Sequence, residues 1–131
     1  MLFDLELYLL RHGDAGRRTA TAAGPDSSDV PLTIAGREEI AVIARSLKHL
    51  NIKYDAIISS PLKRAIQTTK IIAKALVMEK RISIWNELVP EGNRWKIYNR
   101  LNQYTRESTI LMVGHQPYLT NIICDMIFQK E

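Results

Sequence analysis

Two arginines and two histidines follow apolar runs in this 131-residue sequence. In "LYLLRHGDAG", Arg11 and His12 come directly after such a run, and Gly13 then allows a tight turn of the main chain. Arg64 lies in "SSPLKR" after the run "AIIS", and His115 lies in "LMVGHQP". A guanidinium group pairs with phosphate oxygens and keeps its charge, while a neutral imidazole can attack phosphorus and carry a phosphoryl group. These residue types predict a phosphate site that contains a nucleophile.

Four short apolar runs are predicted to be the strands that position these residues: Leu5–Leu10, Ala56–Ser59, Ile82–Trp85 and Thr109–Val113. They lack strict alternation, which indicates burial on both faces, as in a parallel sheet covered by helices. Ligands of such open sheets bind outside the carboxyl ends of the strands. Three of the runs lead into the residues named above, so parallel pairing would bring them together with two helix N-termini, which attract anions.

Helical patterns separate the runs. "TIAGREEIAVIARSLKHL" predicts a helix with Thr33 as its N-cap, and "SPLKRAIQTTKIIAKALVM" predicts one with Ser60 as N-cap and Pro61 as its first residue. "EGNRWKIYNRLNQY" predicts a shorter helix, and "QPYLTNIICDMIF" predicts a last one whose apolar stripe includes Ile123 and Ile127, with Cys124 in the core. Alternating strands and helices predict an α/β three-layer sandwich: a mainly parallel sheet of about four strands with helices on both faces.

The composition favours one domain over residues 1–131, with 46% apolar and 24% charged residues. A single cysteine cannot form an internal disulfide, and no apolar run approaches the roughly 20 residues of a membrane span. Without a signal peptide pattern, the protein is expected to be cytoplasmic and not to bind membranes. The net charge of +4 is spread along the chain, which favours phosphate-bearing partners over nucleic acid.

No cofactor or metal is expected, because no His/Cys/Asp cluster has metal-site spacing and "GDAG" does not match a dinucleotide or phosphate-binding loop. His49 is predicted to be a structural residue in the last turn of its helix. Trp85 and Trp95 are predicted to pack near the rim of the crevice, with substrate stacking as the alternative.

The segments "LLRHGDA", "PLTIAGRE", "IISSPLKRAIQT" and "LMVGHQP" resemble the successive signatures of the histidine phosphatase superfamily. The short length and "NELVPEG" are similar to its small phosphohistidine phosphatase branch, the SixA-like branch. The resemblance runs from about residue 6 to residue 125. It implies a phosphoglycerate-mutase-like fold and a metal-independent phosphatase that forms a phosphohistidine intermediate.

The same resemblance implies roles for individual residues. His12 would be the nucleophile, Arg11 and Arg64 would clamp the phosphate, and His115 would be a second ligand, cationic when it donates to the phosphate oxygens. Gly13 would bring the main chain close to the substrate.

The proton donor has three candidates. Glu87 in "WNEL" matches the position of an acidic donor in many members, and Glu91 and Asp14 are the alternatives. Capping of the loop after the third predicted strand is the other role open to Glu87.

The sequence departs from the family pattern in two places. Many members carry an asparagine ligand a few residues beyond Arg-His-Gly, where this chain has Gly16, Arg17 and Arg18. One of these arginines would replace the asparagine, or both are solvated charges of a predicted loop over Arg17–Pro31. Relatives usually add two strands beyond the position of Glu131. We therefore expect a truncated fold or a homodimer that pairs the exposed edge of the first strand.

The expected substrate is a phosphorylated protein carrying phosphohistidine, because no large insertion after the second or third predicted strand would form a lid over the site. Two alternatives remain at this point. The first is a phosphatase for small phosphorylated molecules, and the second is a phosphoprotein-binding module without catalysis.

Overall fold

The computed structural model describes residues 5–16, 29–104 and 108–128. Over these residues the strands are β1 (Glu6–Arg11), β2 (Ala56–Ser59), β3 (Ile82–Ile84) and β4 (Thr109–Gly114). The helices are α1 (Ile34–Leu50), α2 (Lys63–Leu76), α3 (Arg94–Leu101) and α4 (Tyr118–Phe128), with the short 3-10 helices η1 (Glu79–Arg81) and η2 (Asn86–Leu88). None of the helices in this part of the chain is both long and apolar enough to cross a bilayer.

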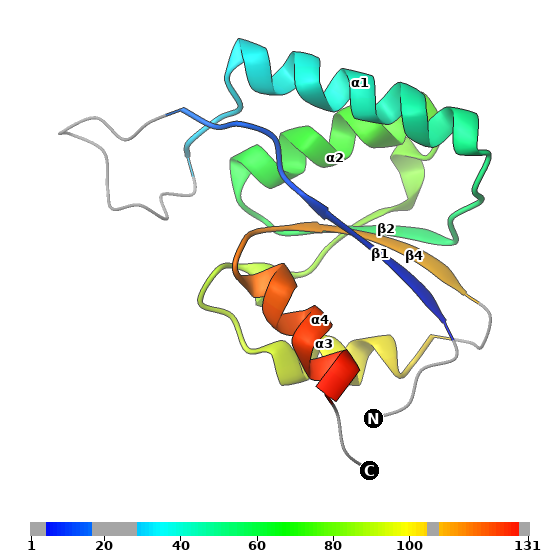
Figure 1. Ribbon diagram of the computed structural model, residues 1–131, viewed down its shortest axis with the longest axis vertical. Coiled ribbons are helices and arrows are strands. Elements are labelled where there is room, and N and C mark those ends of the chain that lie inside the picture. Colours follow the sequence, from blue (N-terminus) through cyan, green and yellow to red (C-terminus); the bar gives the residue numbers. More distant parts are fainter. Residues whose placement is uncertain (1–4, 17–28, 105–107, 129–131) are drawn as a thin grey trace, which may run out of the picture.

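The four strands form one parallel sheet in the order β1-β4-β2-β3. Helices α1 and α2 cover one face, and α3 and α4 cover the other (Figure 1). The predicted α/β three-layer sandwich is therefore confirmed. That residues 1–131 form a single domain remains a prediction.

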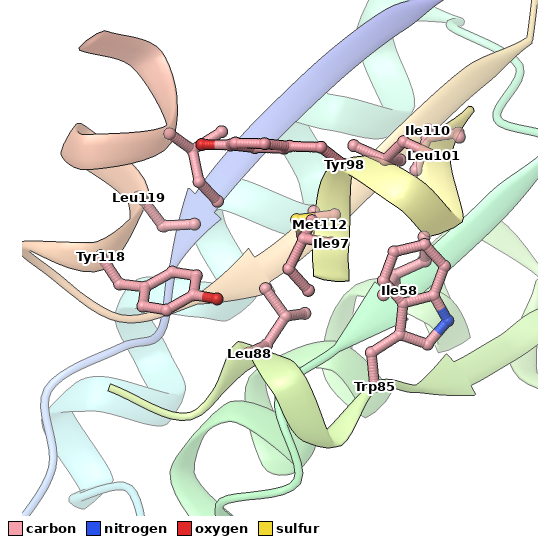
Figure 2. Packing of buried hydrophobic residues seen from close by; sticks show 11 residues of the cluster. Ile58, Trp85, Leu88, Ile97, Tyr98, Leu101, Ile110, Met112, Tyr118 and Leu119 are labelled. Carbon is pink, nitrogen blue, oxygen red and sulfur yellow. The ribbon is translucent and has the colours of Figure 1, made fainter. Parts of the chain in front are cut away.

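Alternating side chains of the strands fill two cores, one on each face of the sheet. Ile57 and Leu111 pack with the buried faces of α1 and α2. Ile58 and Met112 pack with η2, α3 and α4, as Figure 2 shows. Both faces are thus apolar, which explains why the strands read as continuous apolar runs.

The register aligns the carboxyl ends of the three strands that lead into the predicted site. Arg11 pairs with Gly114, and Ser59 pairs with Val113. The N–H of His12 then donates to the carbonyl of Gly114 at 3.1 Å. The loops after β1, β2 and β4 consequently leave the sheet side by side, at the left of Figure 1.

The start of α2 differs from the prediction. The N-cap is Leu62, and the helix begins at Lys63 rather than at Pro61. The hydroxyl of Ser60 accepts from the Leu62 N–H at 3.2 Å, but it also contacts His115 at 2.7 Å. Ser60 therefore belongs to the turn between β2 and α2, outside the helix. The predicted cap of α1 is confirmed, since the hydroxyl of Thr33 accepts from the N–H of Gly36.

The orientation of α4 also differs from the prediction. Cys124 is exposed instead of buried, and Ile123 and Ile127 are exposed as well. The carboxylate of Asp125 accepts from Arg94 and from Tyr98, so this side of α4 faces α3. These polar contacts, with the buried Leu119 and Ile122, fix the rotation of the helix.

The two tryptophans have different surroundings. Trp85 is 3% exposed and packs in the core between the sheet and α3 and α4. The guanidinium of Arg100 lies 4.3 Å from the centroid of the Trp85 ring. Trp95 lies on α3 and is exposed. Trp85 is therefore a core residue and not a residue of the crevice rim.

Candidate active site

His12 is held by its own main chain in the loop after β1. Its Nδ1 lies 2.7 Å from the carbonyl oxygen of Gly13, and its Nε2 lies 3.3 Å from the Nε of Arg64. A carbonyl can only accept, so Nδ1 carries the proton and Nε2 accepts from Arg64. The imidazole is thereby fixed in the tautomer whose Nε2 lone pair points toward a cation.

A threonine of α2 joins this loop to the helix that carries Arg64. The N–H of Gly13 donates to Thr68 Oγ1 at 3.1 Å, and the Thr68 hydroxyl donates to the carbonyl of Arg64 at 2.8 Å. One buried hydroxyl therefore sets the distance between the two chain segments.

Two glycines bring the loop after β1 against the first turn of α1. A Cβ atom on Gly36 would lie 2.1 Å from the carbonyl oxygen of Asp14, and one on Gly13 would lie 2.7 Å from a side-chain carbon of Ile40. Only glycine fits at Gly36 without moving the backbone that follows His12.

His115 lies beside His12 but in a more buried position. The two rings are 5.0 Å apart between centroids, and His115 is 2% exposed. Its Nε2 lies 2.7 Å from the hydroxyl of Ser60, which also accepts from the N–H of Leu62. Arg64 is likewise buried, at 6% exposed. The second histidine is thus positioned by a side chain from the loop after β2.

Burial and neighbouring positive charge keep both imidazoles neutral. Burial, with the charges of His12 and Arg64, lowers the pKa of His115 from 6.5 to about 3. Burial also lowers the pKa of His12, and the charges of Arg64 and Arg11 add to this shift. The carbonyl of Gly13 and the carboxylate of Asp14 oppose it. A cationic His115 would therefore require the negative charge of a bound phosphate.

The three candidate proton donors differ in their surroundings. Glu87 lies in η2, where its Oε1 accepts from Arg100 at 2.9 Å. Hydrogen bonds from its own backbone N–H and from Arg100 lower the pKa of Glu87, so the group is a carboxylate at neutral pH. Asp14 accepts from the Thr33 hydroxyl at 2.8 Å, and Glu91 is exposed.

The structure brings His12, Arg64 and His115 together, with Arg11 at the exposed end of β1. Arg17 and Arg18 lie outside the described residues. Within the ranges that the structure describes, no group of three His, Cys, Asp or Glu side chains is arranged to hold a metal ion. The arrangement can hold a tetrahedral anion beside a neutral imidazole nitrogen.

Residues 7–89 match the model of the histidine phosphatase superfamily (branch 1). The chain belongs to the histidine phosphatase superfamily. It is 32% identical over 117 residues to an uncharacterized protein of Picosynechococcus sp., covering 88% of this chain and 68% of that protein. It is 27% identical over 124 residues to phosphohistidine phosphatase SixA of Escherichia coli K12, covering 93% and 74%.

The fold of this histidine phosphatase is similar to that of a solved SixA structure. The structure of the protein histidine phosphatase SixA complexed with tungstate matches with a TM-score of 0.80 and 26% identity, over 91% of this chain and 74% of that one. These similarities support the SixA-like branch and the phosphoglycerate-mutase-like fold, and they identify the chain as a phosphatase.

Sequence reasoning missed three residues that shape the site. Ser60 was assigned only to a helix cap, and Thr68 and Gly36 were given no role at the site. Thr68 follows Arg64 by four residues, so both lie on one face of α2, and this spacing is the signal that could have revealed it. The contact between Ser60 and His115 joins residues 55 positions apart, and no local pattern predicts it.

Proposed function

We propose that this phosphatase removes the phosphoryl group from phosphohistidine on a protein, by way of a covalent phosphohistidine at His12. One observation carries the proposal: the Nδ1 of His12 is held by the Gly13 carbonyl, while its Nε2 lone pair faces Arg64. A nucleophile needs a fixed ring and an unprotonated nitrogen, and the lone pair of Nε2 becomes available when Arg64 turns its N–H from Nε2 to a phosphate oxygen.

In the first step, Nε2 of His12 would attack phosphorus, forming a new P–N bond as the P–N bond of the substrate breaks. Arg64 and Arg11 would pair with the phosphate oxygens, where negative charge is held during transfer. His115 would take up a proton as the dianion arrives and donate a hydrogen bond to one of those oxygens. Its lowered pKa makes it neutral beforehand, so the proton would come from solvent or from the phosphate group itself as the anion binds.

In the second step, water would attack the phosphorus of phospho-His12. The P–N bond to Nε2 breaks, inorganic phosphate leaves, and the proton lost by water passes to a carboxylate or to phosphate itself. Glu87 is already ionised, so it suits this proton-accepting role better than the donation of a proton to a leaving group.

Glu87 is already ionised and is therefore a poor proton donor, which favours phosphohistidine as the substrate. The substrate imidazole can carry a proton on the nitrogen that does not bear phosphorus, so it leaves as neutral imidazole without an external donor. An alkoxide leaving group would need such a donor. The connections after β2 and β4 are also short, at residues 60–62 and 115–117, so neither forms a lid against a protein surface.

A matched pair of peptides tests the substrate class. One peptide carries phosphohistidine and the other carries phosphoserine in the same surrounding sequence, and phosphate release is measured for both. We expect the phosphohistidine peptide to be hydrolysed at least about tenfold faster, because its leaving group needs no acid. Faster release from phosphoserine, or from a small phosphomonoester, would favour the small-molecule alternative.

The nucleophile is tested separately. His12→Ala is expected to lower turnover by at least about a thousandfold, as removal of a covalent nucleophile does. His49→Ala, at the far end of α1, is the matched control and should keep normal turnover. Acid-labile phosphate should be trapped on the wild-type chain and not on His12→Ala. Equal turnover of the wild type and His12→Ala would overturn the mechanism.

The homodimer and the cytoplasmic location stay predictions. Within the described residues, β1 pairs with β4 on one side only, and a strand edge of this kind favours pairing with another chain. Light scattering at high protein concentration tests the dimer, and a sharp monomer peak would contradict it.

A further inference from the structure

A hollow of about 410 Å³ lies where α1 and α2 end, lined by Lys48, Asn51, Ile52, Lys53, Tyr54, Ala75, Leu76, Val77, Met78 and Arg81. Helix α2 carries Arg64 in its first turn and borders the hollow with its last two residues. A helix of 14 residues is roughly 20 Å long, so the hollow is remote from the candidate active site. Figure 1 shows the ends of α1 and α2 at the right, opposite the carboxyl ends of the strands.

The charge lining this hollow is positive. Lys48, Lys53 and Arg81 come from three different segments, and the lining includes no acidic residue. In the described part of the chain, none of the three forms an ion pair with a carboxylate. The ends of α1 and α2 add partial negative charge of roughly −0.5 each, which three full positive charges exceed.

The other wall of the hollow is apolar. Ile52, Leu76, Val77 and Met78 are among its lining residues, and Val77 is 82% exposed. Ligand sites of comparable size combine an apolar lining with a few polar groups that fix orientation. A ligand that fits both walls has an anionic end and an apolar body.

A second observation that points to a ligand is the buried hydroxyl of Tyr54, another residue that lines the hollow. It is 4% exposed, and its hydroxyl has no hydrogen-bond partner among the described residues. Burial raises the pKa of Tyr54, so the group is a neutral O–H donor that requires an acceptor. Buried polar groups without partners are rare in folded proteins, and a ligand with acceptor oxygens would bring such a partner to this corner.

We propose that this hollow binds a small amphipathic anion: a carboxylate, phosphate or sulfonate group attached to an apolar or aromatic body. The site is separate from the one that holds the reacting phosphoryl group. Its occupant contacts the end of α2, whereas the substrate contacts the start of that helix.

The probe for this proposal is 8-anilinonaphthalene-1-sulfonate, added to the intact protein. We expect saturable binding with a Kd below about 1 mM and perturbed amide signals at residues 51–54 and 75–81 in a two-dimensional NMR titration. Inorganic phosphate lacks the apolar body, so a concentration that just saturates the active site should leave this binding unchanged. N-phenyl-1-naphthylamine, which lacks the sulfonate, should bind at least about threefold more weakly.

Arg81→Gln and Lys80→Gln form the matched pair of variants, because both residues lie in η1 and only Arg81 lines the hollow. Arg81→Gln should weaken probe binding at least about threefold, while Lys80→Gln should leave it unchanged. Phosphatase activity should stay normal in both. Three results would each overturn the proposal: equal effects of the two substitutions, competition by phosphate at the concentration that saturates the active site, or signal changes confined to residues 11–13 and 114–115.

Discussion

The loops after β1 and β4 each present a histidine, but they hold it in different ways. His12 is partly exposed, fixed through Nδ1 by the carbonyl of Gly13, and its Nε2 faces Arg64. His115 is buried, and its Nε2 contacts the hydroxyl of Ser60. Because β1 and β4 are parallel and Arg11 pairs with Gly114, both loops leave the sheet at the same level and in the same direction. The partners of the two rings differ in the way that the proposed roles require, with His12 as the nucleophile and His115 as a phosphate ligand.

Arg64→Ala should affect both loops and have the largest effect. Arg64 contacts Nε2 of His12, and its charge acts on the pKa of both histidines. We expect kcat/KM to fall by about 10²–10³, as for the loss of one preorganised donor in a transition state. Lys63→Ala, the neighbouring exposed position on α2, is the control for steady-state kinetics. A loss in kcat/KM below about threefold would contradict the proposed role of Arg64 in binding the phosphate.

Gly36→Ala should affect the loop after β1 alone. The new Cβ would lie 2.1 Å from the carbonyl oxygen of Asp14, so the segment that follows His12 must shift. A displacement of about 1 Å at a reacting group can cost about 10²-fold in rate, so we expect a loss of about 10- to 100-fold. Gly16→Ala is the control, because its Cβ would meet nothing closer than 3.9 Å. Similar kcat values for both variants would show that this packing does not position His12.

Ser60→Ala should affect the loop after β4, together with the turn before α2 where the same hydroxyl accepts from the Leu62 N–H. It removes the hydroxyl that contacts Nε2 of His115, and the net value of such a hydrogen bond is about 1 kcal/mol. We expect kcat/KM to fall by about five- to tenfold. Ser83→Ala on β3 is a control with no contact to His115. Unchanged kinetics for Ser60→Ala would mean that burial alone holds the ring of His115.

The pH dependence of stability should report on His115 alone of the two loops' contacts, as a change in slope rather than in rate. Its pKa falls from 6.5 in the unfolded chain to about 3 in the folded protein, so the unfolded state binds more protons between these values. The stability gained from a neutral His115 is complete above pH 6.5 and is lost as the pH falls, by at most about 1.4 kcal/mol per pH unit. Urea unfolding between pH 6.5 and 4.5 should therefore show a weaker pH dependence for His115→Gln than for the wild type. Equal slopes would contradict the buried, neutral state of this histidine.

The strands and the convergence of the site could be predicted because strands buried on both faces appear in the sequence as continuous apolar runs. The prediction for Ala56–Ser59 has the observed ends, β1 is shifted by one residue at each end, and β3 and β4 differ by one residue at their carboxyl ends. Once the sheet is parallel, residues at the carboxyl ends of neighbouring strands must meet. Arg64 and His115 could be placed in this way without any knowledge of strand order.

The remaining differences come from contacts between distant segments. The local pattern predicts Ser60 as a helix cap, but its hydroxyl contacts Nε2 of His115, and the helix begins three residues later. The last helix carries apolar residues around most of its circumference, so its periodicity did not define the buried side. The contacts of Asp125 with Arg94 and Tyr98 decide the rotation that exposes Cys124.

The sheet order has a consequence for synthesis on the ribosome. The strand at residues 6–11 has its described neighbour at residues 109–114, although β2 and β3 are made in between. About a hundred residues must be made after His12 before its backbone N–H can reach the carbonyl of Gly114. The proposed nucleophile is thus translated well before the strand that its loop contacts, and this backbone contact can form only after β4 has been made.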